Sequence, residues 1–184
     1  HGLFGSQEEI DNAWTDANGN KIPYTNTLMQ THEKYITYPG DIKFEDLNGN
    51  NKIDKGADTV NDSGDRTIIG NKEPRYIYSL NLNLEWNGIY ASAFFRGVGK
   101  QDWYPSNESP FWGQYNRPFG YMLKAHTGND VYREELDNWD TAYWPRYSSY
   151  QTHEKSNNRV LTTPNDRYLQ NVAYIRLKNL TIDY

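Results

Sequence analysis

The chain has 184 residues, a formal net charge of −5 and no cysteine, which excludes disulfide bonds, thiolate metal sites and cysteine nucleophiles. An acidic chain without a visible basic face also argues against a nucleic-acid partner. Hydrophobic residues make up only 36% of the sequence while aromatic residues reach 15%, so a large dry core is not expected.

Residues 1–73 are predicted to be a long polar loop region that contains one short helix. Ser6 followed three positions later by Glu9 is a capping box, in which the two side chains satisfy backbone N–H groups at a helix start. Ile10 and Trp14 follow as apolar residues of that helix, and the turn-forming residues 16–20 are expected to end it.

A calcium loop is predicted between residues 46 and 54. Oxygen ligands are available at alternate positions, from the side chains of Asp46, Asn48, Asn50 and Asp54 and from the carbonyl of Lys52. Oxygens in this order surround the ion in EF-hand-like and dockerin-like loops. Two positions depart from that pattern, because Asn51 replaces the usual glycine and Ala57 the usual terminal acid. A solvated turn without an ion is the alternative.

Residues 74–97 are predicted to form a β-hairpin. From Tyr76 to Trp86, apolar or aromatic residues alternate with mainly polar ones, which is the period of a strand. Asn87-Gly88 then favours a type I′ turn, because both residues tolerate positive φ. A two-residue turn sets the register of the two strands. On one face it should pair Trp86 with Ile89, Leu84 with Ala91, Leu82 with Ala93 and Leu80 with Phe95. On the other face it should pair Glu85 with Tyr90, Asn83 with Ser92, Asn81 with Phe94 and Ser79 with Arg96.

The first arm of this hairpin favours a membrane-spanning strand. Tyr76 to Trp86 has about the length that a tilted strand needs to cross a hydrocarbon layer, whereas strands average about five or six residues. Its apolar row runs from aromatic residues through leucines to Trp86, as expected of a lipid-facing band with interfacial girdles. The polar row suits a wet lumen. A half-buried hairpin of a soluble sandwich is the alternative.

Residues 98–166 are predicted to be a second long loop region, rich in aromatic residues, with a short helix near Val131 to Trp139. Most of these rings are expected to build a small core of the loop itself. Stacking on a substrate is the second interpretation, and the candidate substrate-binding residues are Trp103, Tyr104 and Trp112.

Residues 167–184 are predicted to return to strand structure. The alternation of apolar residues changes phase once, between Leu177 and Leu180, so a β-bulge is expected near Lys178. Two loop regions of this length separated by one tight turn are typical of outer-membrane barrels and not of compact soluble domains.

Four sequence motifs, in this order along the chain, point to a particular protein family: PGDIKFEDLNGNNKID, DRTIIGNKEPRYIYSLNLNLEWNGIYASAFFRGVG, NWDTAYWPRY and YIRLKNLTIDY. From Pro39 onward, and in GLFGSQEEID before it, the chain resembles the C-terminal part of SusC/RagA-type TonB-dependent outer-membrane transporters. The resemblance implies an all-β fold, in which the antiparallel strands form part of a large plugged transmembrane β-barrel of about 22 strands and long extracellular loops carry short helices.

The resemblance also implies a function and partners. Such proteins import oligosaccharides most often, or peptides, across the Gram-negative outer membrane, where lipid surrounds the barrel. They work with a SusD-like surface lipoprotein, and a TonB complex acts on an N-terminal plug that these residues do not include. From their length, the loop regions 1–73 and 98–166 are expected outside the cell, and the tight turn at Asn87-Gly88 in the periplasm.

In the family pattern an acidic residue directly before Arg-Thr closes the calcium loop, and here Asp65 stands before Arg66-Thr67. The resemblance therefore implies that Asp65 completes the site of Asp46, Asn48, Asn50, Lys52 and Asp54, after an insertion within residues 55–64. The ion would be structural Ca²⁺.

No enzyme is predicted. The four histidines, His1, His32, His126 and His153, are scattered without a paired carboxylate or a metal-ligand spacing, and each is expected to be a solvated loop residue. The rival from another class is a soluble calcium-stabilised carbohydrate-binding β-module, which would have to pack the apolar row of the hairpin against another sheet.

Overall fold

The computed structural model describes the chain apart from residues 1, 29–35, 107–108, 116–120, 148–160 and 162. The chain divides into two compact units, His1–Ile68 with Pro105–Arg167, and Ile69–Tyr104 with Tyr168–Tyr184. It is mostly β, with small antiparallel sheets and a few short helices, and the described residues close no barrel. The first unit combines most of the two predicted loop regions, and the second holds the predicted strands.

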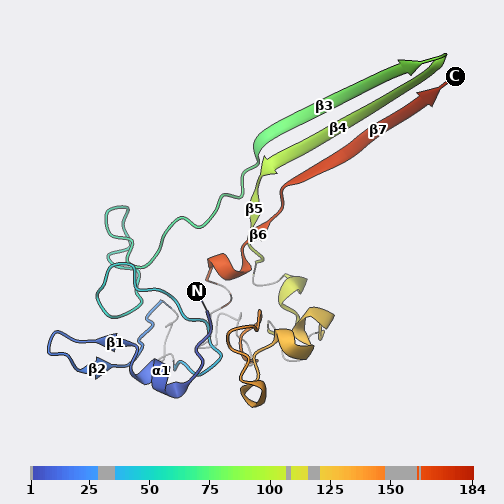
Figure 1. The fold of residues 1–184 in the computed structure, drawn as a ribbon. Helices are drawn as coiled ribbons and strands as arrows, with labels where there is room; N and C mark the ends of the chain where they lie inside the picture. Colours follow the sequence, from blue (N-terminus) through green and yellow to red (C-terminus); the bar gives the residue numbers. More distant parts are fainter. Residues whose placement is uncertain (1, 29–35, 107–108, 116–120, 148–160, 162) are drawn as a thin grey trace. The chain divides into compact units, whose positions relative to one another are not determined.

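The second unit contains a three-stranded antiparallel sheet in the order β3-β4-β7 (Figure 1). β3 spans Arg75–Trp86, β4 spans Ile89–Lys100 and β7 spans Tyr174–Asp183. All the cross-strand pairs predicted for the hairpin are present, from Trp86 opposite Ile89 to Ser79 opposite Arg96. The predicted register is therefore confirmed.

Two further predictions about this sheet are confirmed. Asn87 and Gly88 both have positive φ, 51° and 86°, as a type I′ turn requires. On β7, Asn179 lies opposite Phe94 and Leu177 opposite Phe95, which leaves Lys178 as the extra residue of a β-bulge. The bulge returns the apolar residues before and after it to the same face of the sheet.

The register sorts the side chains of the sheet onto two faces. The apolar face is made of Tyr78, Leu80, Leu82, Leu84 and Trp86 of β3, Ile89, Ala91, Ala93 and Phe95 of β4, and Ile175, Leu177, Leu180 and Ile182 of β7. The polar face includes Ser79, Asn81, Asn83 and Glu85 of β3, Tyr90, Ser92, Phe94 and Arg96 of β4, and Arg176, Asn179, Thr181 and Asp183 of β7. Tyr76 departs from the regular strand, because its φ is 54°.

The first unit begins with helix α1, Gln7–Asp11. Its capping box is present in a shifted form: Ser6 Oγ accepts the N–H of Glu9 at 3.1 Å, while Glu9 Oε2 accepts the N–H of Gly5 at 2.9 Å. The helix ends earlier than predicted, with Asn12 as its C-cap.

Residues 16–20 form the turn of a small hairpin and do not end the helix. Its strands are β1, Trp14–Thr15, and β2, Lys21–Ile22. Asp16 Oδ1 accepts the N–H groups of Asn18 and Asn20, each at 2.8 Å, and such local hydrogen bonds favour a turn over further helix.

The helix predicted near Val131 to Trp139 is wrong, since only Glu134–Leu136 (η4) form a 3-10 turn there. Hydrogen bonds from the side chain of Asn138 hold this segment in a turn instead: Asn138 Oδ1 accepts the N–H of Arg133 at 2.9 Å, and Asn138 Nδ2 donates to the carbonyl of Val131 at 3.0 Å. Further 3-10 turns are η1 (Pro110–Tyr115), η2 (Lys124–His126), η3 (Gly128–Asp130) and η6 (Asp166–Tyr168). In the second unit, β5 (Asp102–Trp103) pairs with β6 (Gln170–Asn171).

Two groups of buried side chains stabilise the first unit. Phe4, Ile10, Tyr24 and Ile53 pack together in the first loop region. In the second loop region the buried residues are mainly aromatic, and Trp112, Tyr115 and Trp144 are at most 3% exposed. The prediction that this loop builds its own small aromatic core is confirmed for these rings.

Candidate functional site

The apolar face of the sheet is exposed along its length. Leu82 in the middle of β3 is 46% exposed, and Leu84, Trp86 and Ile182 are 71%, 75% and 68% exposed. Within the second unit, no second layer of described residues covers this face. Because soluble monomers rarely expose contiguous apolar patches larger than a few hundred Å², it is suited to an apolar environment or an apolar partner.

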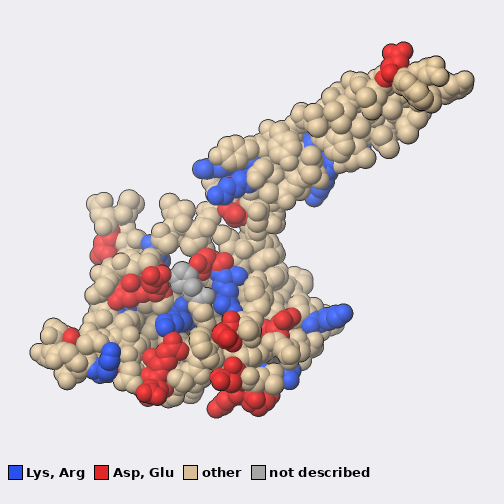
Figure 2. Space-filling model, in the orientation of Figure 1, with Lys and Arg blue, Asp and Glu red and all other residues tan. Residues whose placement is uncertain are grey.

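The polar face carries charges of opposite sign at its two ends. Glu85 and Asp183 share a row with Tyr90 close to the turn. Arg96 and Arg176 lie opposite each other farther from the turn. Figure 2 shows Lys and Arg gathered toward the end of the sheet away from the turn, and acidic side chains at its tip.

The structure brings Asp65 against the predicted calcium loop. Asp65 Oδ1 accepts the N–H groups of Leu47 and Asn48 at 2.8 and 3.3 Å, and its Oδ2 accepts the N–H of Asp54 at 2.7 Å. The two ends of the loop, at Asp46 and Asp54, are therefore linked through one carboxylate. Ala57, which occupies the usual terminal position, has no side-chain oxygen.

Residues 55–64 leave the loop and re-enter it at the same point. The Asp65 N–H donates to the Asp54 carbonyl at 2.9 Å, so the chain returns to the point where it left. Gly64 has φ of 59°, and an added Cβ would lie 2.4 Å from the Asp54 carbonyl oxygen. Only glycine allows this close approach. Val60, within this segment, is fully exposed.

Asn51 adopts the left-handed conformation expected at the glycine position of the loop. Its φ is 60°, and its N–H donates to Asp46 Oδ2 at 2.7 Å. Asp46 Oδ1 accepts the N–H of Gly49 at 2.6 Å. Asparagine is among the few residues that visit this conformation routinely, which explains how the turn forms without glycine.

Other oxygens of the loop also accept hydrogen bonds within it. Asn48 Oδ1 accepts the N–H of Asn50, and Asn50 Oδ1 that of Lys52, both at 3.1 Å. Lys52 Nζ lies 2.8 Å from Asp54 Oδ2 and, together with the Gly56 N–H and the Asn50 amide, lowers the pKa of Asp54 to about 2.

Ca²⁺ prefers hard oxygen donors, so the donor set of Asp46, Asn48, Asn50, Asp54 and Asp65 fits this ion in type and in order. The arrangement is not that of a preformed metal cluster, because no group of three or more His, Asp or Glu side chains in the described chain is placed to hold a metal. The ammonium of Lys52 would have to leave Asp54 before that carboxylate could become a ligand.

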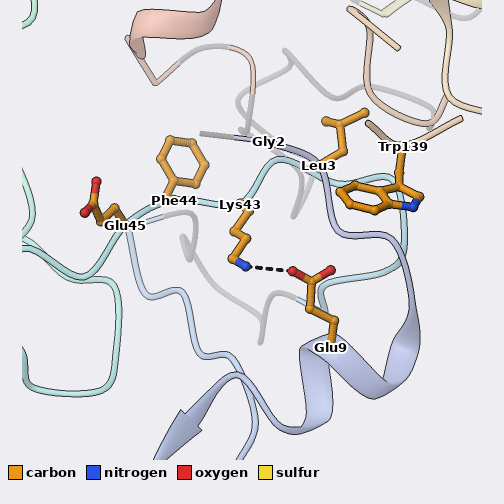
Figure 3. Close-up of a pocket in the computed structure, with 7 residues that line it drawn as sticks. All are labelled: Gly2, Leu3, Glu9, Lys43, Phe44, Glu45 and Trp139. Atoms are coloured by element: carbon orange, nitrogen blue, oxygen red, sulfur yellow. Dashed lines mark hydrogen bonds and ion pairs between the residues drawn. The ribbon is translucent and has the colours of Figure 1, made fainter. Parts of the chain in front are cut away.

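An open pocket of about 340 Å³ lies in the first unit (Figure 3). Lys43 Nζ lies 2.6 Å from Glu9 Oε1 on its wall, and Trp139 packs so closely on Gly5 that an added Cβ would meet the indole at 2.9 Å. The pocket is lined by Gly2, Leu3, Glu9, Lys43, Phe44, Glu45 and Trp139. Sequence reasoning missed it, because Glu9 and Lys43 come from distant segments with no shared motif.

The three candidate substrate-binding aromatics are in different environments. Trp112 is 0% exposed, and its indole N–H donates to the Ser106 carbonyl at 2.8 Å, so the candidacy of Trp112 is corrected: its ring belongs to the core. Trp103 is 44% exposed in β5 and Tyr104 is half-buried. These two belong to the second unit and Trp112 to the first.

The prediction of a solvated His126 is wrong. The residue is 6% exposed, and its ring centroid lies 4.2 Å from that of Trp144 and 5.2 Å from that of Tyr115. Both ring nitrogens are buried, and burial lowers the pKa of His126, opposed in part by the Phe111 backbone. No sequence signal marks this histidine, because its burial depends on rings that are remote in sequence.

No family model, curated protein or solved structure matches this chain. None of the helices in the described part of the chain is long and apolar enough to cross a membrane.

Proposed function

We propose that this chain supplies part of the wall and the outer loops of a TonB-dependent outer-membrane importer of the SusC/RagA type. The proposal rests above all on the exposed apolar face of β3, β4 and β7, on which Leu82 and Leu84 are 46% and 71% exposed. Lipid tails are an environment in which such a face needs no covering protein layer.

The dimensions and edges of the sheet support the proposal. β3 has 12 residues and β7 has 10, against about 9–11 for a tilted strand that spans a bilayer. Tyr78 and Trp86 lie toward opposite ends of the apolar row, as in an interfacial girdle. β3 and β7 are edge strands in this sheet, and their free backbone groups would be satisfied by neighbouring strands of a barrel.

In this proposal the loop regions 1–73 and 98–166 face the outside of a Gram-negative cell and Asn87-Gly88 faces the periplasm. A SusD-like lipoprotein caps the outer mouth, and a TonB complex acts on the plug. The solute is an oligosaccharide or a peptide. The protein itself performs no chemistry on it.

Detergent dependence tests the class of protein. We expect the purified chain to be monodisperse only in detergent micelles, because the apolar face would otherwise associate in water. Size-exclusion chromatography with light scattering, with and without detergent, measures this. A folded, detergent-free monomer would instead favour the soluble carbohydrate-binding module.

Cysteine labelling tests the orientation, since the natural chain has no cysteine. Asn50→Cys should react with a membrane-impermeant maleimide on intact cells, and Gly88→Cys should react only after the outer membrane is opened. Labelling of residue 88 but not of residue 50 on intact cells contradicts the orientation.

We also propose that the loop of Asp46, Asn48, Asn50, Lys52, Asp54 and Asp65 holds a structural Ca²⁺ ion. When bound, the ion would rigidify the outer loop. Calcium should raise the melting temperature of the wild-type chain, and Asp65→Asn should reduce that shift, whereas Asp62→Asn in the insertion should not. Equal shifts in all three proteins contradict the site.

A further inference from the structure

Basic residues lie directly opposite each other at two places in the sheet. Arg96 of β4 is opposite Arg176 of β7, and Arg75 of β3 is opposite Lys100 of β4. Like charges in directly opposed positions destabilise a sheet. Each opposed pair therefore concentrates positive charge at one point of the sheet, and an anion bound there would relieve the repulsion.

The sheet does not supply that group for Arg96 and Arg176. Its acids, Glu85 and Asp183, lie in the row of Tyr90, roughly 20 Å along β4 from Arg96 at about 3.3 Å per residue. Among the described residues, no carboxylate forms an ion pair with either arginine. Both guanidinium groups are therefore available to an anion from outside the sheet.

The surroundings of the two arginines suit an oxyanion. The guanidinium of Arg176 lies 4.2 Å above the ring of Tyr174, a contact that orients its planar fork. Ser79 completes the row beside Arg96, and Asn179 follows on β7 after the bulge. Guanidinium groups bind carboxylate, sulfate and phosphate through paired charge-assisted hydrogen bonds, and hydroxyl and amide groups can add further donors.

We infer that Arg96 and Arg176 form a binding point for an oxyanion group carried by the imported solute. The inference rests on the proposed function, because in an importer the polar face lines the aqueous path. It makes the solute anionic, with a carboxylate, sulfate or phosphate group. Arg75 and Lys100 add positive potential in the same sheet, and such a potential raises the local concentration of anions.

Titration of the whole chain in detergent micelles tests the inference, with binding followed through the arginine side-chain N–H signals by NMR at constant ionic strength. Galacturonate and an Ala-Glu dipeptide are the anionic probes, and galactose and Ala-Gln are their neutral counterparts. Sodium sulfate reports the inorganic ion alone. We expect at least one organic anion to bind at least tenfold more tightly than its neutral counterpart.

Arg176→Gln should weaken binding of that anion at least tenfold, whereas Lys72→Gln, which removes the same charge outside the strands, should leave it unchanged. Without anion, Arg176→Gln should raise the melting temperature, because the repulsion with Arg96 is relieved. A merely structural arginine would not give these opposite effects.

Binding of galacturonate assigns the solute to acidic saccharides, and binding of Ala-Glu to acidic peptides. Sulfate binding alone, equal binding of neutral probes, or unchanged binding by Arg176→Gln overturns the inference. If the chain proves monomeric without detergent, the importer proposal fails on that measurement, and the same titration in water still decides whether the arginines bind anions.

Discussion

Asp41 and Arg146 are 105 positions apart in the sequence, and the Arg146 Nε lies 2.6 Å from Asp41 Oδ1. Asp41 is 1% exposed, and its Oδ2 also accepts the N–H of Tyr38 at 3.0 Å. The guanidinium of Arg146 lies 4.7 Å above the ring of Tyr38. This ion pair joins the two loop regions within the first unit.

Arg146→Gln should destabilise the first unit by about 3 kcal/mol or more, because it leaves the buried Asp41 carboxylate without its counter-charge. Lys43→Gln breaks the pair with Glu9, in which the lysine side chain is 48% exposed, and should cost at most about 1 kcal/mol. Denaturant unfolding followed by tryptophan fluorescence compares the two variants. Equal decreases in the free energy of unfolding would mean that the Asp41–Arg146 pair stabilises the unit no more than an exposed ion pair does.

Lys52→Gln should raise the pKa of Asp54, which the neighbouring ammonium, backbone N–H and amide hold at about 2 in the wild type. A lowered folded-state pKa means that the stabilisation is present above the ordinary value of 3.8 and is lost as the pH falls toward 2. Carboxyl chemical shifts recorded from pH 5 to pH 1.5 measure the change. An unchanged titration curve in the variant contradicts the role of Lys52.

Asn51→Ala should destabilise the loop by about 1 kcal/mol, since alanine is strained at a φ of 60°. Asn51→Gly serves as the matched control, because glycine adopts this conformation without strain and should restore the stability apart from the weak hydrogen bond to the Thr15 carbonyl at 3.3 Å. Thermal unfolding of both variants tests the prediction, which fails if glycine is as destabilising as alanine.

Leu82→Arg should weaken folding into lipid vesicles by about 2–4 kcal/mol, the cost of a cation facing the middle of a bilayer. Asn83→Arg places the same charge on the neighbouring position and the opposite face, where a small effect is expected. Urea-dependent folding in vesicles gives both values. A larger loss of stability for Asn83→Arg than for Leu82→Arg would indicate that the face of Asn83 contacts lipid and the face of Leu82 lines the lumen.

His126→Phe should make the first unit less sensitive to acid. Burial lowers the pKa of His126 below its ordinary value of 6.5, so the unfolded chain binds the proton more readily and stability falls as the pH drops below 6.5. Phenylalanine removes the titrating group together with its buried ring nitrogens. Between pH 7.5 and pH 5, the melting temperature should fall less in His126→Phe than in the wild type. An equal fall in the two proteins contradicts the prediction.

The sequence by itself determined the features whose interactions are local. The turn at Asn87-Gly88 fixes its own conformation and with it the pairing of β3 with β4, because a register shift by one residue would exchange the two faces. The phase change around Lys178 determined the bulge in the same way. Ser6 determined the start of α1 through a hydrogen bond that spans three residues.

Tertiary structure decided whatever depends on partners remote in the sequence. The burial of Trp112 and His126 and the pairing of Asp41 with Arg146 depend on packing between distant segments. Local propensity contributes only fractions of a kcal/mol per residue to such choices, whereas burial of an aromatic side chain contributes about 1.5–3 kcal/mol. The conformation of the long loop regions therefore depends on long-range packing, whereas the strands follow from the local alternation of apolar and polar residues.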